Sequence, residues 1–511
     1  MQKENGAVKK RPPIVVVVGH VDHGKTTLLD YIRKLSHAAN GVGGNGPRSV
    51  AEREAGGITQ SIGAYEIVHP SASSGQVGAA VEKITFIDTP GHEAFSKMRE
   101  RGAKIADIAI LVVAADDGVE PQTKEAINIL TDSKTHFVVA INKVDKAGEA
   151  GIMKTKNELT AAGVLLEGYG GSVSFQEISA KTGQGVSELL DLILLAADVE
   201  HLSYDPTQAG EGVILEAKRD SRRGVTVTAI VTDGTIRIGD RIASVNAGGQ
   251  VKALEDSSGK RIARAEPSAP VLILGFEEVP AVGAAFRTGE AAGITAASPA
   301  VPKPAPARVS ELEAGNKEEM NILRVMLKAD VVGSLEALTE IVSHLPLPKN
   351  VTFKVMETGI GEITDGDIQH AISTGSIMVG FRADITKAAD NLAKAHRVKM
   401  FMSDIVYELV KSLELEIKVL GGEELVGELE ILAVFGKKDD AQVIGGRVIK
   451  GVVKKNASFR VMRGVDRITE GRIVNLQQMR KDAAEVKEGN ECGLLVKAEK
   501  DIRVGDRLMF V

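Results

Sequence analysis

The chain has 511 residues and a mass of 54.0 kDa, which predicts about three to four domains and excludes a single small module. Apolar residues make up 43% and charged residues 26%, a balance that excludes wholesale disorder and a fibrous repeat. The single cysteine excludes a disulfide-rich secreted scaffold, and no segment is apolar enough for a signal peptide or a membrane span. We therefore expect a cytoplasmic monomer without a membrane partner.

The charge is unevenly distributed along the chain. The net charge of −6 argues weakly against a nucleic-acid partner. Residues 427–511, however, contain 17 basic and 13 acidic side chains, which gives this segment a charge of +4. Only the C-terminal part therefore favours contact with phosphate groups.

The first long segment alternates between strand-like and helix-like patterns. After a polar tail over residues 1–13, the run Ile14–Val18 is apolar and β-branched throughout, as in a strand buried on both faces of a parallel sheet. Similar runs follow at 84–87, 108–113 and 137–141. The alternation predicts a doubly wound α/β domain over residues 14–200.

The remaining segments differ in pattern from the first and from one another. Short β-branched runs are separated by the turn-forming dipeptides Asp233-Gly234, Gly239-Asp240 and Gly248-Gly249. Further along the chain, Ser403 is a residue type that often caps the start of a helix. The sequence predicts a β-barrel over 211–290, a Pro- and Ala-rich linker over 291–318, an αβα domain over 319–400, a connecting helix over 401–424 and a C-terminal β-barrel over 427–511.

One short stretch recurs in the two predicted barrels. Ile236–Ile242 reads I-R-I-G-D-R-I, and Ile502–Leu508 reads I-R-V-G-D-R-L. Duplication of one barrel explains the echo, but so does the independent use of a Gly-Asp turn between strands.

The segment Gly19–Thr26 reads G-H-V-D-H-G-K-T, which matches the phosphate-loop pattern G-x-x-x-x-G-K-T between a predicted strand and a predicted helix. In such a loop, backbone N–H groups surround the phosphates, Lys25 neutralises charge, and the Thr26 hydroxyl binds Mg²⁺. The motif alone does not distinguish ATP from GTP.

A second motif selects the base. Asn142–Asp145 reads N-K-V-D and follows an apolar strand, which places Asp145 at the ligand-binding edge of the sheet. Its carboxylate can accept from N1–H and the 2-amine of guanine, whereas adenine has no donor at either position. The sequence therefore predicts guanine selection, with Ser179, Ala180 and Lys181 closing over the base.

Two further segments are predicted to surround the γ-phosphate. Asp88–Gly91 ends a strand, where Asp88 is expected to hold Mg²⁺ through water. We hypothesise that His92 orients the attacking water; the alternative is that His92 caps the next helix. In the Gly-rich stretch Gly56–Thr59, Thr59 is predicted to supply a second hydroxyl to Mg²⁺. A metal site made by His20 and His23 lacks a further ligand set.

The predicted sites comprise a catalytic residue, metal ligands and nucleotide contacts. The catalytic candidate is His92, and the metal ligands are Thr26, Thr59 and, through water, Asp88. The predicted nucleotide-binding residues are Gly19, His20, Val21, Asp22, His23, Gly24, Lys25, Thr26, Thr27, Asp88, Thr89, Pro90, Gly91, His92, Asn142, Lys143, Val144, Asp145, Ser179, Ala180 and Lys181.

Together these motifs resemble those of a translational GTPase. Further stretches narrow the resemblance: Ala55–Gln60, Ile62–Tyr65, Ala114–Gly118, Lys328–Ser334, Glu485–Gly489 and Glu491–Gly493. With them, the sequence resembles bacterial translation initiation factor two over residues 14–511, in a short form without the usual N-terminal region.

The resemblance implies a GTP-hydrolysing initiation factor that binds formyl-methionyl initiator tRNA and promotes joining of the small and large ribosomal subunits. Ribosome contact would trigger hydrolysis and release. The implied cofactors are GTP or GDP, Mg²⁺ and a monovalent cation near Asp22, with Val21 and Ile58 gating water. The terminal barrel would hold the tRNA end through Glu491, Cys492 and Gly493.

Several positions depart from the family pattern. Gln477, Gln478 and Met479 occupy positions where the family tends to have Lys-Arg-aromatic, and Gly446 occupies that of a frequent cysteine. These positions border the formyl-methionine site, so the sequence leaves formyl selectivity open. The first switch is also lengthened around Asn40–Gly46. For Cys492, a small buried residue in a strand is the alternative to a pocket role.

Two competing functions remain at this point. In the first, the protein is an elongation-type carrier that delivers aminoacyl-tRNA. In the second, it is a ribosome-assembly GTPase with no preference for initiator tRNA. The αβα domain and the apolar stripe over residues 406–420 argue against the elongation-type carrier. The positive charge of the last barrel is compatible with all of these functions and does not distinguish between them.

Overall fold

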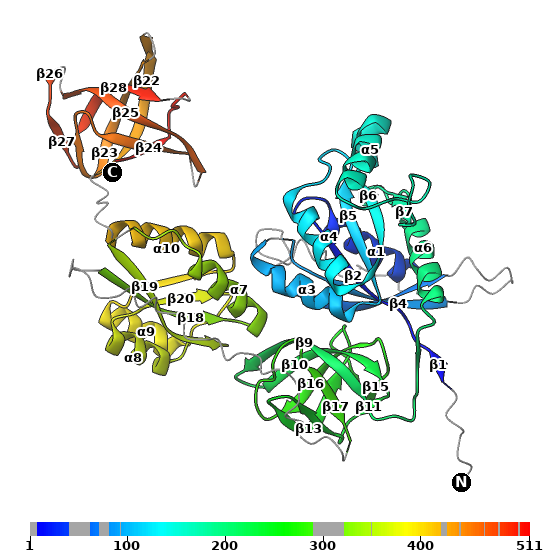
Figure 1. Ribbon diagram of the computed structural model, residues 1–511. Coiled ribbons are helices and arrows are strands. Elements are labelled where there is room, and N and C mark those ends of the chain that lie inside the picture. The colour runs from blue at the N-terminus through cyan, green and yellow to red at the C-terminus, as the bar shows by residue number, and fades with distance from the viewer. Residues whose placement is uncertain are drawn as a thin grey trace, which may run out of the picture. The chain divides into compact units, whose positions relative to one another are not determined.

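The computed structural model describes residues 8–39, 62–70, 81–91, 93–289, 321–348, 350–420, 427–438, 441–463, 466–478, 481–498 and 501–510. These residues form two compact units, and the second contains the C-terminal barrel. The predicted fold class is confirmed: a P-loop α/β sheet, two closed β-barrels and a smaller α/β sheet (Figure 1).

A mostly parallel sheet forms the centre of the first domain. Its order is β3 (Gly63–Pro70), β4 (Val81–Asp88), β2 (Ile14–Gly19), β5 (Ile108–Ala114), β6 (His136–Asn142) and β7 (Phe175–Glu177). Only β3 and β4 pair antiparallel. All six residues of β2 are buried, as expected for a central strand in a parallel sheet.

Helices cover both faces of this sheet (Figure 1). Apolar side chains of α1 (Lys25–Ala39) and α6 (Val186–Val199) pack on one face. The other face is covered by α3 (Ser96–Ile105), α4 (Pro121–Ser133) and α5 (Val144–Ala161), and the short 3₁₀ helix η2 (Glu93–Phe95) precedes α3. Because β4, β2, β5 and β6 are parallel, the loops after them meet at one edge of the sheet.

The next domain is a closed barrel. Its strands are β9 (Glu211–Asp220), β10 (Gly224–Asp233), β12 (Arg241–Ser244), β13 (Gly248–Glu255), β16 (Pro270–Phe276) and β17 (Ala285–Thr288), and β12–β13 pairing closes the ring. The short strands nearby are β1 (Lys9–Lys10), β8 (Ser203–Tyr204), β11 (Ile236–Arg237), β14 (Arg261–Ile262) and β15 (Arg264–Ala265).

The predicted turns of this barrel are only partly confirmed. Gly234 and Gly239 have positive φ angles of 65° and 97°, as turn glycines do. Gly248 and Gly249 instead begin β13 and pair with β12, so the turn lies just before them. A Cβ at Gly249 would lie 2.2 Å from the Gly275 carbonyl oxygen, so this glycine permits a close strand approach.

The smaller α/β sheet has the order β19 (Val351–Ile360), β18 (Asn321–Ala329), β20 (Ile377–Phe381) and β21 (Met400–Ser403). Its helices are α7 (Val332–Ser343), α8 (Asp365–Thr374), α9 (Lys387–His396) and α10 (Val406–Leu420). The sequence prediction placed a boundary at residue 400, whereas β21 continues the sheet to Ser403 by parallel pairing with β20. The Ser403 hydroxyl accepts from the Ile405 N–H at 3.0 Å, just before α10 begins.

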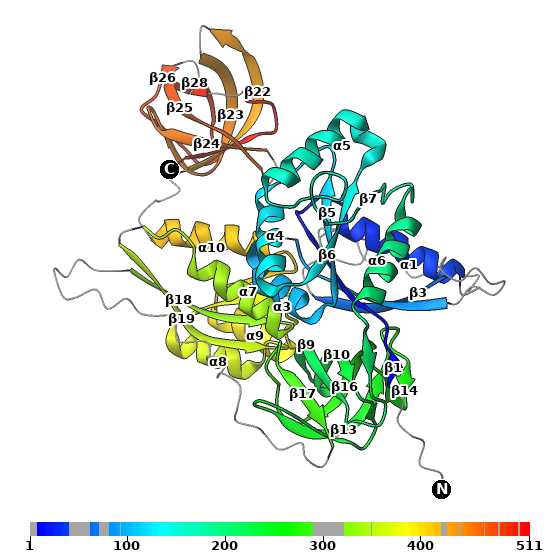
Figure 2. The same cartoon turned by 45° about the vertical axis from the view of Figure 1, so that its right-hand side comes forward.

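The C-terminal domain is a second closed barrel (Figure 2). Its strands are β22 (Gly427–Lys438), β23 (Ala441–Lys454), β24 (Ser458–Arg463), β25 (Asp466–Gln478), β28 (Glu491–Ala498) and β29 (Arg507–Phe510), with the short strands β26 (Lys481–Asp482) and β27 (Glu485–Lys487). When the six long strands of each barrel are numbered in chain order, neighbours around the ring follow the order 1, 2, 5, 4, 3 and 6 in both barrels. The two barrels therefore share one topology.

The sequence echo, however, does not mark equivalent positions in the two barrels. Ile236–Ile242 leads into β12, the third strand of the first ring. Ile502–Leu508 leads into β29, the sixth strand of the second ring. The repeated motif therefore reflects the shared chemistry of a Gly-Asp turn before a strand, although the ring orders agree. Among the helices that the structure describes, none is long and apolar enough to cross a membrane.

Candidate guanine-nucleotide site

The loop between β2 and α1 has the close backbone approaches that a phosphate loop requires. Gly19 has a φ of 141°, and a Cβ there would lie 2.3 Å from the Val112 carbonyl oxygen. Gly24 has a φ of 90°, and a Cβ there would lie 2.4 Å from Asn142 Nδ2. The loop can therefore lie against β5 and β6 only with glycine at both positions. The Val21 N–H is fixed by Gln122 Oε1 at 3.0 Å.

The Asn142 side chain, in the N-K-V-D segment, forms hydrogen bonds to two other predicted nucleotide-binding segments. Its Nδ2 donates to the His23 carbonyl oxygen at 2.8 Å, and its Oδ1 accepts from the Ala180 N–H at 2.9 Å. The Asn142 side chain is 2% exposed, so neither bond competes with bulk water. The structure thus brings the phosphate loop, the N-K-V-D segment and the Ser179–Lys181 segment together.

Asp145 lies where a base can reach it. The side chain is exposed on the first turn of α5, and a hydrogen bond from Ser179 holds the pKa of the Asp145 carboxyl below its usual value. The carboxylate is therefore charged at neutral pH and keeps acceptor capacity for guanine donors. Guanine selection by Asp145 stays a prediction at this point.

Lys143 is held by two acidic residues that the sequence analysis noted only as part of a resemblance. Its Nζ lies 2.9 Å from Asp117 Oδ2 and 3.1 Å from Asp116 Oδ1. Burial opposes the charge, but these two carboxylates raise the pKa of Lys143 overall. Both aspartates follow β5, so their place after a parallel strand was the available sequence signal.

The phosphate end of the site contains a buried cation and a buried acid. Lys25 Nζ donates to the carbonyl oxygens of Gly19 at 2.8 Å and His20 at 2.5 Å. Burial lowers the pKa of Lys25 to about 8, with Asp88 opposing the shift and Arg99 adding to it. Gly91 lies against this lysine, because a Cβ there would be 2.4 Å from Nζ.

The residues present fit a magnesium ion. Asp88 is 3% exposed at the end of β4, and Thr26 lies in the first turn of α1. A single carboxylate and a hydroxyl next to a phosphate loop suit Mg²⁺, which keeps waters and phosphate oxygens as its other ligands. In the described ranges, no three His, Cys, Asp or Glu side chains cluster at metal-binding distance.

His23 supports the loop as a neutral side chain. The ring is fully buried, and burial lowers its pKa to about 4, with His20 contributing. Its Nδ1 lies 3.4 Å from the Val112 carbonyl oxygen. A neutral imidazole adds no charge toward phosphate, so His23 packs beneath the loop. Asp22 is exposed with a φ of 64°, and Thr27 is also exposed.

Three residues predicted near the γ-phosphate lie outside the described residues: Ile58, Thr59 and the catalytic candidate His92. Thr89 is placed: its hydroxyl donates to the Val17 carbonyl oxygen at 2.9 Å, which ties the segment after β4 to β2.

Sequence reasoning did not identify Arg99, which contacts this same segment. Its side chain is 1% exposed and is the largest fully buried one in the described residues. Nη1 donates to the Pro90 carbonyl oxygen at 3.1 Å, and Nη2 lies 2.6 Å from Glu125 Oε1. The arginine was missed because charged residues on a predicted helix are usually solvated.

In the terminal barrel, the predicted tRNA-end residues Glu491, Cys492 and Gly493 all lie on β28, and the departing positions Gly446 and Gln477 lie on the strands beside it. Gly446 of β23 is opposite Cys492 of β28, and Gly493 of β28 is opposite Gln477 of β25. Cys492 is 7% exposed and belongs to the barrel core, and burial raises its pKa to about 12. Its thiol therefore packs as an apolar group.

Glu491 is exposed and ion-paired. Its Oε1 lies 2.6 Å from Arg447 Nη2 on the neighbouring strand. Met479 lies outside the described residues, and Gln477 Nε2 donates to Asp482 Oδ1 at 2.8 Å. Polar and apolar groups are both exposed here, because the exposed Phe435 ring lies beside Gly445, the residue that pairs with Gly493.

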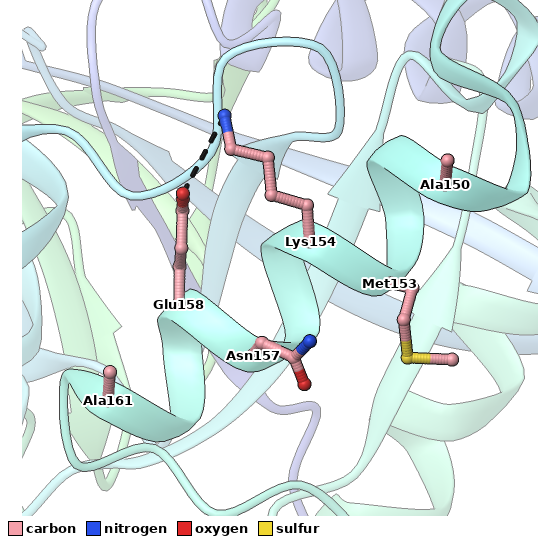
Figure 3. Close-up of a pocket in the computed structure, with 6 residues that line it drawn as sticks. All are labelled: Ala150, Met153, Lys154, Asn157, Glu158 and Ala161. Carbon is pink, nitrogen blue, oxygen red and sulfur yellow. Dashed lines mark ion pairs between the residues drawn. The ribbon is translucent and has the colours of Figure 1, made fainter.

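A separate hollow of 540 Å³ lies on the outer side of α5 (Figure 3). Its lining comes from one helix face, and its Lys154–Glu158 ion pair has an N–O distance of 3.6 Å. None of the predicted nucleotide residues lines it. The hollow is therefore separate from the predicted nucleotide residues on the loops after β2, β4 and β6.

A doubly wound sheet with these loops, followed by a barrel, defines a GTPase of the translation-factor class. The model for the Elongation factor Tu GTP binding domain matches residues 10–198, and that for Translation-initiation factor 2 matches residues 303–414. Elongation factor G domain 2 matches residues 209–289, and Elongation factor Tu domain 2 matches residues 441–509.

Relatives that match nearly all of this chain assign it to one family within the translation-factor class. Translation initiation factor IF-2 of Bacillus subtilis is 38% identical, with 98% of this chain and 68% of the relative covered. That of Aquifex aeolicus is 40% identical, with 98% and 61% covered. The chain belongs to the translation initiation factor IF-2 family. It thus spans less than two thirds of the length of the Aquifex relative.

Among solved structures, that of GDP-bound aIF5B from Aeropyrum pernix is 26% identical, with a TM-score of 0.46, and 98% of this chain and 92% of that chain are covered.

Proposed function

We propose that this protein is a cytoplasmic, monomeric initiation factor that hydrolyses GTP when ribosomal subunits join. It positions formyl-methionyl initiator tRNA, contacts both subunits and dissociates after hydrolysis. The observation that carries the proposal is the Asn142 side chain, which bonds to two nucleotide segments in a chain of this family.

The described residues support nucleotide binding in defined roles. Backbone N–H groups of the loop after β2 and the start of α1 face the phosphates, and the Lys25 ammonium neutralises their charge. Asp145 accepts from guanine, while Asn142 keeps the base and phosphate segments in register. Magnesium, held by Thr26, Thr59 and, through water, Asp88, would supply positive charge at the phosphate oxygens; a monovalent cation beside Asp22 is part of the same proposal.

Hydrolysis requires little covalent participation by the protein. Phosphoryl transfer to water is catalysed mainly by positioning and electrostatic stabilisation. We assign His92 the role of orienting the attacking water. We expect slow turnover without ribosomes and fast turnover on ribosome contact.

The terminal barrel supports tRNA binding less directly. Gly446, Gln477 and Gly493 lie on adjacent strands, next to the exposed Glu491. Cys492 acts there through packing rather than by direct contact, because its side chain belongs to the core. We infer a relaxed reader of the formyl-methionyl end.

The deciding experiment is GTP hydrolysis by the purified protein with and without both ribosomal subunits, using formylated and unformylated initiator tRNA. Stimulation by joining subunits with a formyl preference supports the full proposal. Stimulation without that preference supports a relaxed terminal barrel. Absence of stimulation by mature subunits contradicts the proposal and favours the assembly GTPase.

A further inference from the structure

Arg99 is a buried charge with two well-defined partners. Its guanidinium bridges the Pro90 carbonyl oxygen, at 3.1 Å, and Glu125 Oε1, at 2.6 Å. Burying an arginine costs several kcal/mol, at the order-of-magnitude level, and an ion pair with the partly exposed Glu125 rarely repays that cost in stability. Stability alone therefore does not account for a fully buried arginine at this position.

The contact on one side of Arg99 is with the segment that faces the phosphates. Pro90 lies between Thr89, which is tied to Val17, and Gly91, which lies against Lys25. A Cβ on Gly102, one turn after Arg99, would lie 2.9 Å from Thr89 Cγ2. Helix α3 is therefore in direct contact with the segment that Arg99 bonds.

The contact on the other side is with a rigid element. Glu125 belongs to α4, whose Thr123, Ala126 and Leu130 are buried in the domain core. Glu125 Oε1 also accepts from the Ser96 hydroxyl at 2.5 Å, so the first turn of α3 is tied to the same carboxylate. Glu125 thus fixes both the start of α3 and the arginine.

We propose that Arg99 is a positioning residue for GTP hydrolysis: it holds the Pro90–Gly91 backbone, next in sequence to the proposed catalytic residue His92, in register with α4. The inference rests on the proposed function, because it concerns the same reaction. Arg99 itself contacts neither base nor phosphate loop in the bonds described. Its planar fork can reach two acceptors at once, whereas a lysine has one nitrogen for both.

The test uses the full chain and three substitutions. Arg99→Lys keeps the charge but not the fork, and Glu125→Gln keeps the size of the side chain but not its charge. Lys104→Met is the control, because it removes an exposed cation from the same helix, where Lys104 pairs only with Glu100 in the bonds described. The measurements are kcat and KM of ribosome-stimulated hydrolysis, the Kd for fluorescent GDP and the unfolding temperature.

The expected result is a fall in kcat of about 10- to 100-fold for Arg99→Lys, because a misplacement near 1 Å has that effect. Glu125→Gln should show a smaller fall, and the Kd for GDP should change by less than about threefold in both. Lys104→Met should match the parent. A merely structural arginine would instead lower the unfolding temperature and GDP affinity together, and would overturn the inference.

Failure of the inference and failure of the proposed function give different results. If the parent protein shows no ribosome-stimulated hydrolysis, the proposed function fails. If the parent is stimulated and a folded Arg99→Lys protein has the same kcat, only the positioning role fails. Arg99→Lys and Glu125→Gln are measured in the same hydrolysis assay. If one of these proteins does not fold, the other still tests the positioning role.

Discussion

Asn142 Nδ2 donates to the backbone carbonyl of His23 at 2.8 Å, across 119 residues of sequence. The same side chain accepts from Ala180, so one amide links loops that come from three parts of the chain. Because the amide is buried, replacing it leaves a carbonyl and an N–H without their partners.

We expect Asn142→Ala to weaken GDP binding by about 10- to 100-fold, since each unpaired buried group costs about 1–3 kcal/mol. Fluorescent GDP titration measures the change. Asn157→Ala is a matched control, because Asn157 is exposed on α5 beside the hollow (Figure 3). Equal affinity of the Asn142→Ala protein and this control would contradict the linking role.

Asp145→Asn should convert base preference from guanine to xanthine. The amide presents a donor where xanthine has its 2-oxo group, and it removes an acceptor that the 2-amine of guanine requires. Competition between GDP and xanthosine diphosphate for the site measures the change. An unaltered preference would show that Asp145 does not contact the base.

The sequence was sufficient to predict the buried parallel strands and the loops that meet at one edge of the sheet, because the P-loop and N-K-V-D motifs are local and follow buried strands. It did not reveal Arg99 or Gln122, since their partners are distant backbone groups that no periodicity encodes. The strand β21 was missed for a related reason. Four residues next to a helix are too short for an alternating pattern to stand out.

Glu216 gives a pH dependence of stability. The carboxyl of β9 accepts from the Gly333 N–H at 3.1 Å at the start of α7, and burial raises its pKa to about 7. Since the folded pKa exceeds the ordinary 4.5, the folded state binds more protons than the unfolded state between these values. This contribution to stability is therefore present at low pH and is lost as pH rises through about 7.

We expect Glu216→Gln to be more stable than the parent at pH 8, by up to about 3 kcal/mol, and to approach it near pH 5. The amide retains an oxygen that can accept from Gly333 without a buried charge. Thermal unfolding of both proteins across this pH range measures the difference. A stability gap that does not change with pH would contradict the assignment.

The last prediction concerns Gly446 and Gly493, which lie on adjacent strands at the proposed tRNA end. A Cβ at Gly446 would lie 2.4 Å from Leu429 Cδ2 and 2.5 Å from the Glu430 carbonyl oxygen, whereas no atom lies within 4 Å of one at Gly493. Gly446→Cys should therefore destabilise the barrel by about 1–3 kcal/mol, the usual cost of overpacking. Gly493→Ala should leave the unfolding temperature nearly unchanged.

Measuring initiator-tRNA binding by the Gly446→Cys and Gly493→Ala proteins distinguishes a loss of barrel packing from a loss of tRNA recognition. If Gly493→Ala weakens binding while the barrel stays folded, the open edge beside Gly493 faces the tRNA end. If both substitutions leave binding unchanged, the site lies elsewhere on the barrel. Chemical unfolding of the full chain, monitored alongside tRNA binding, gives both readouts from one preparation.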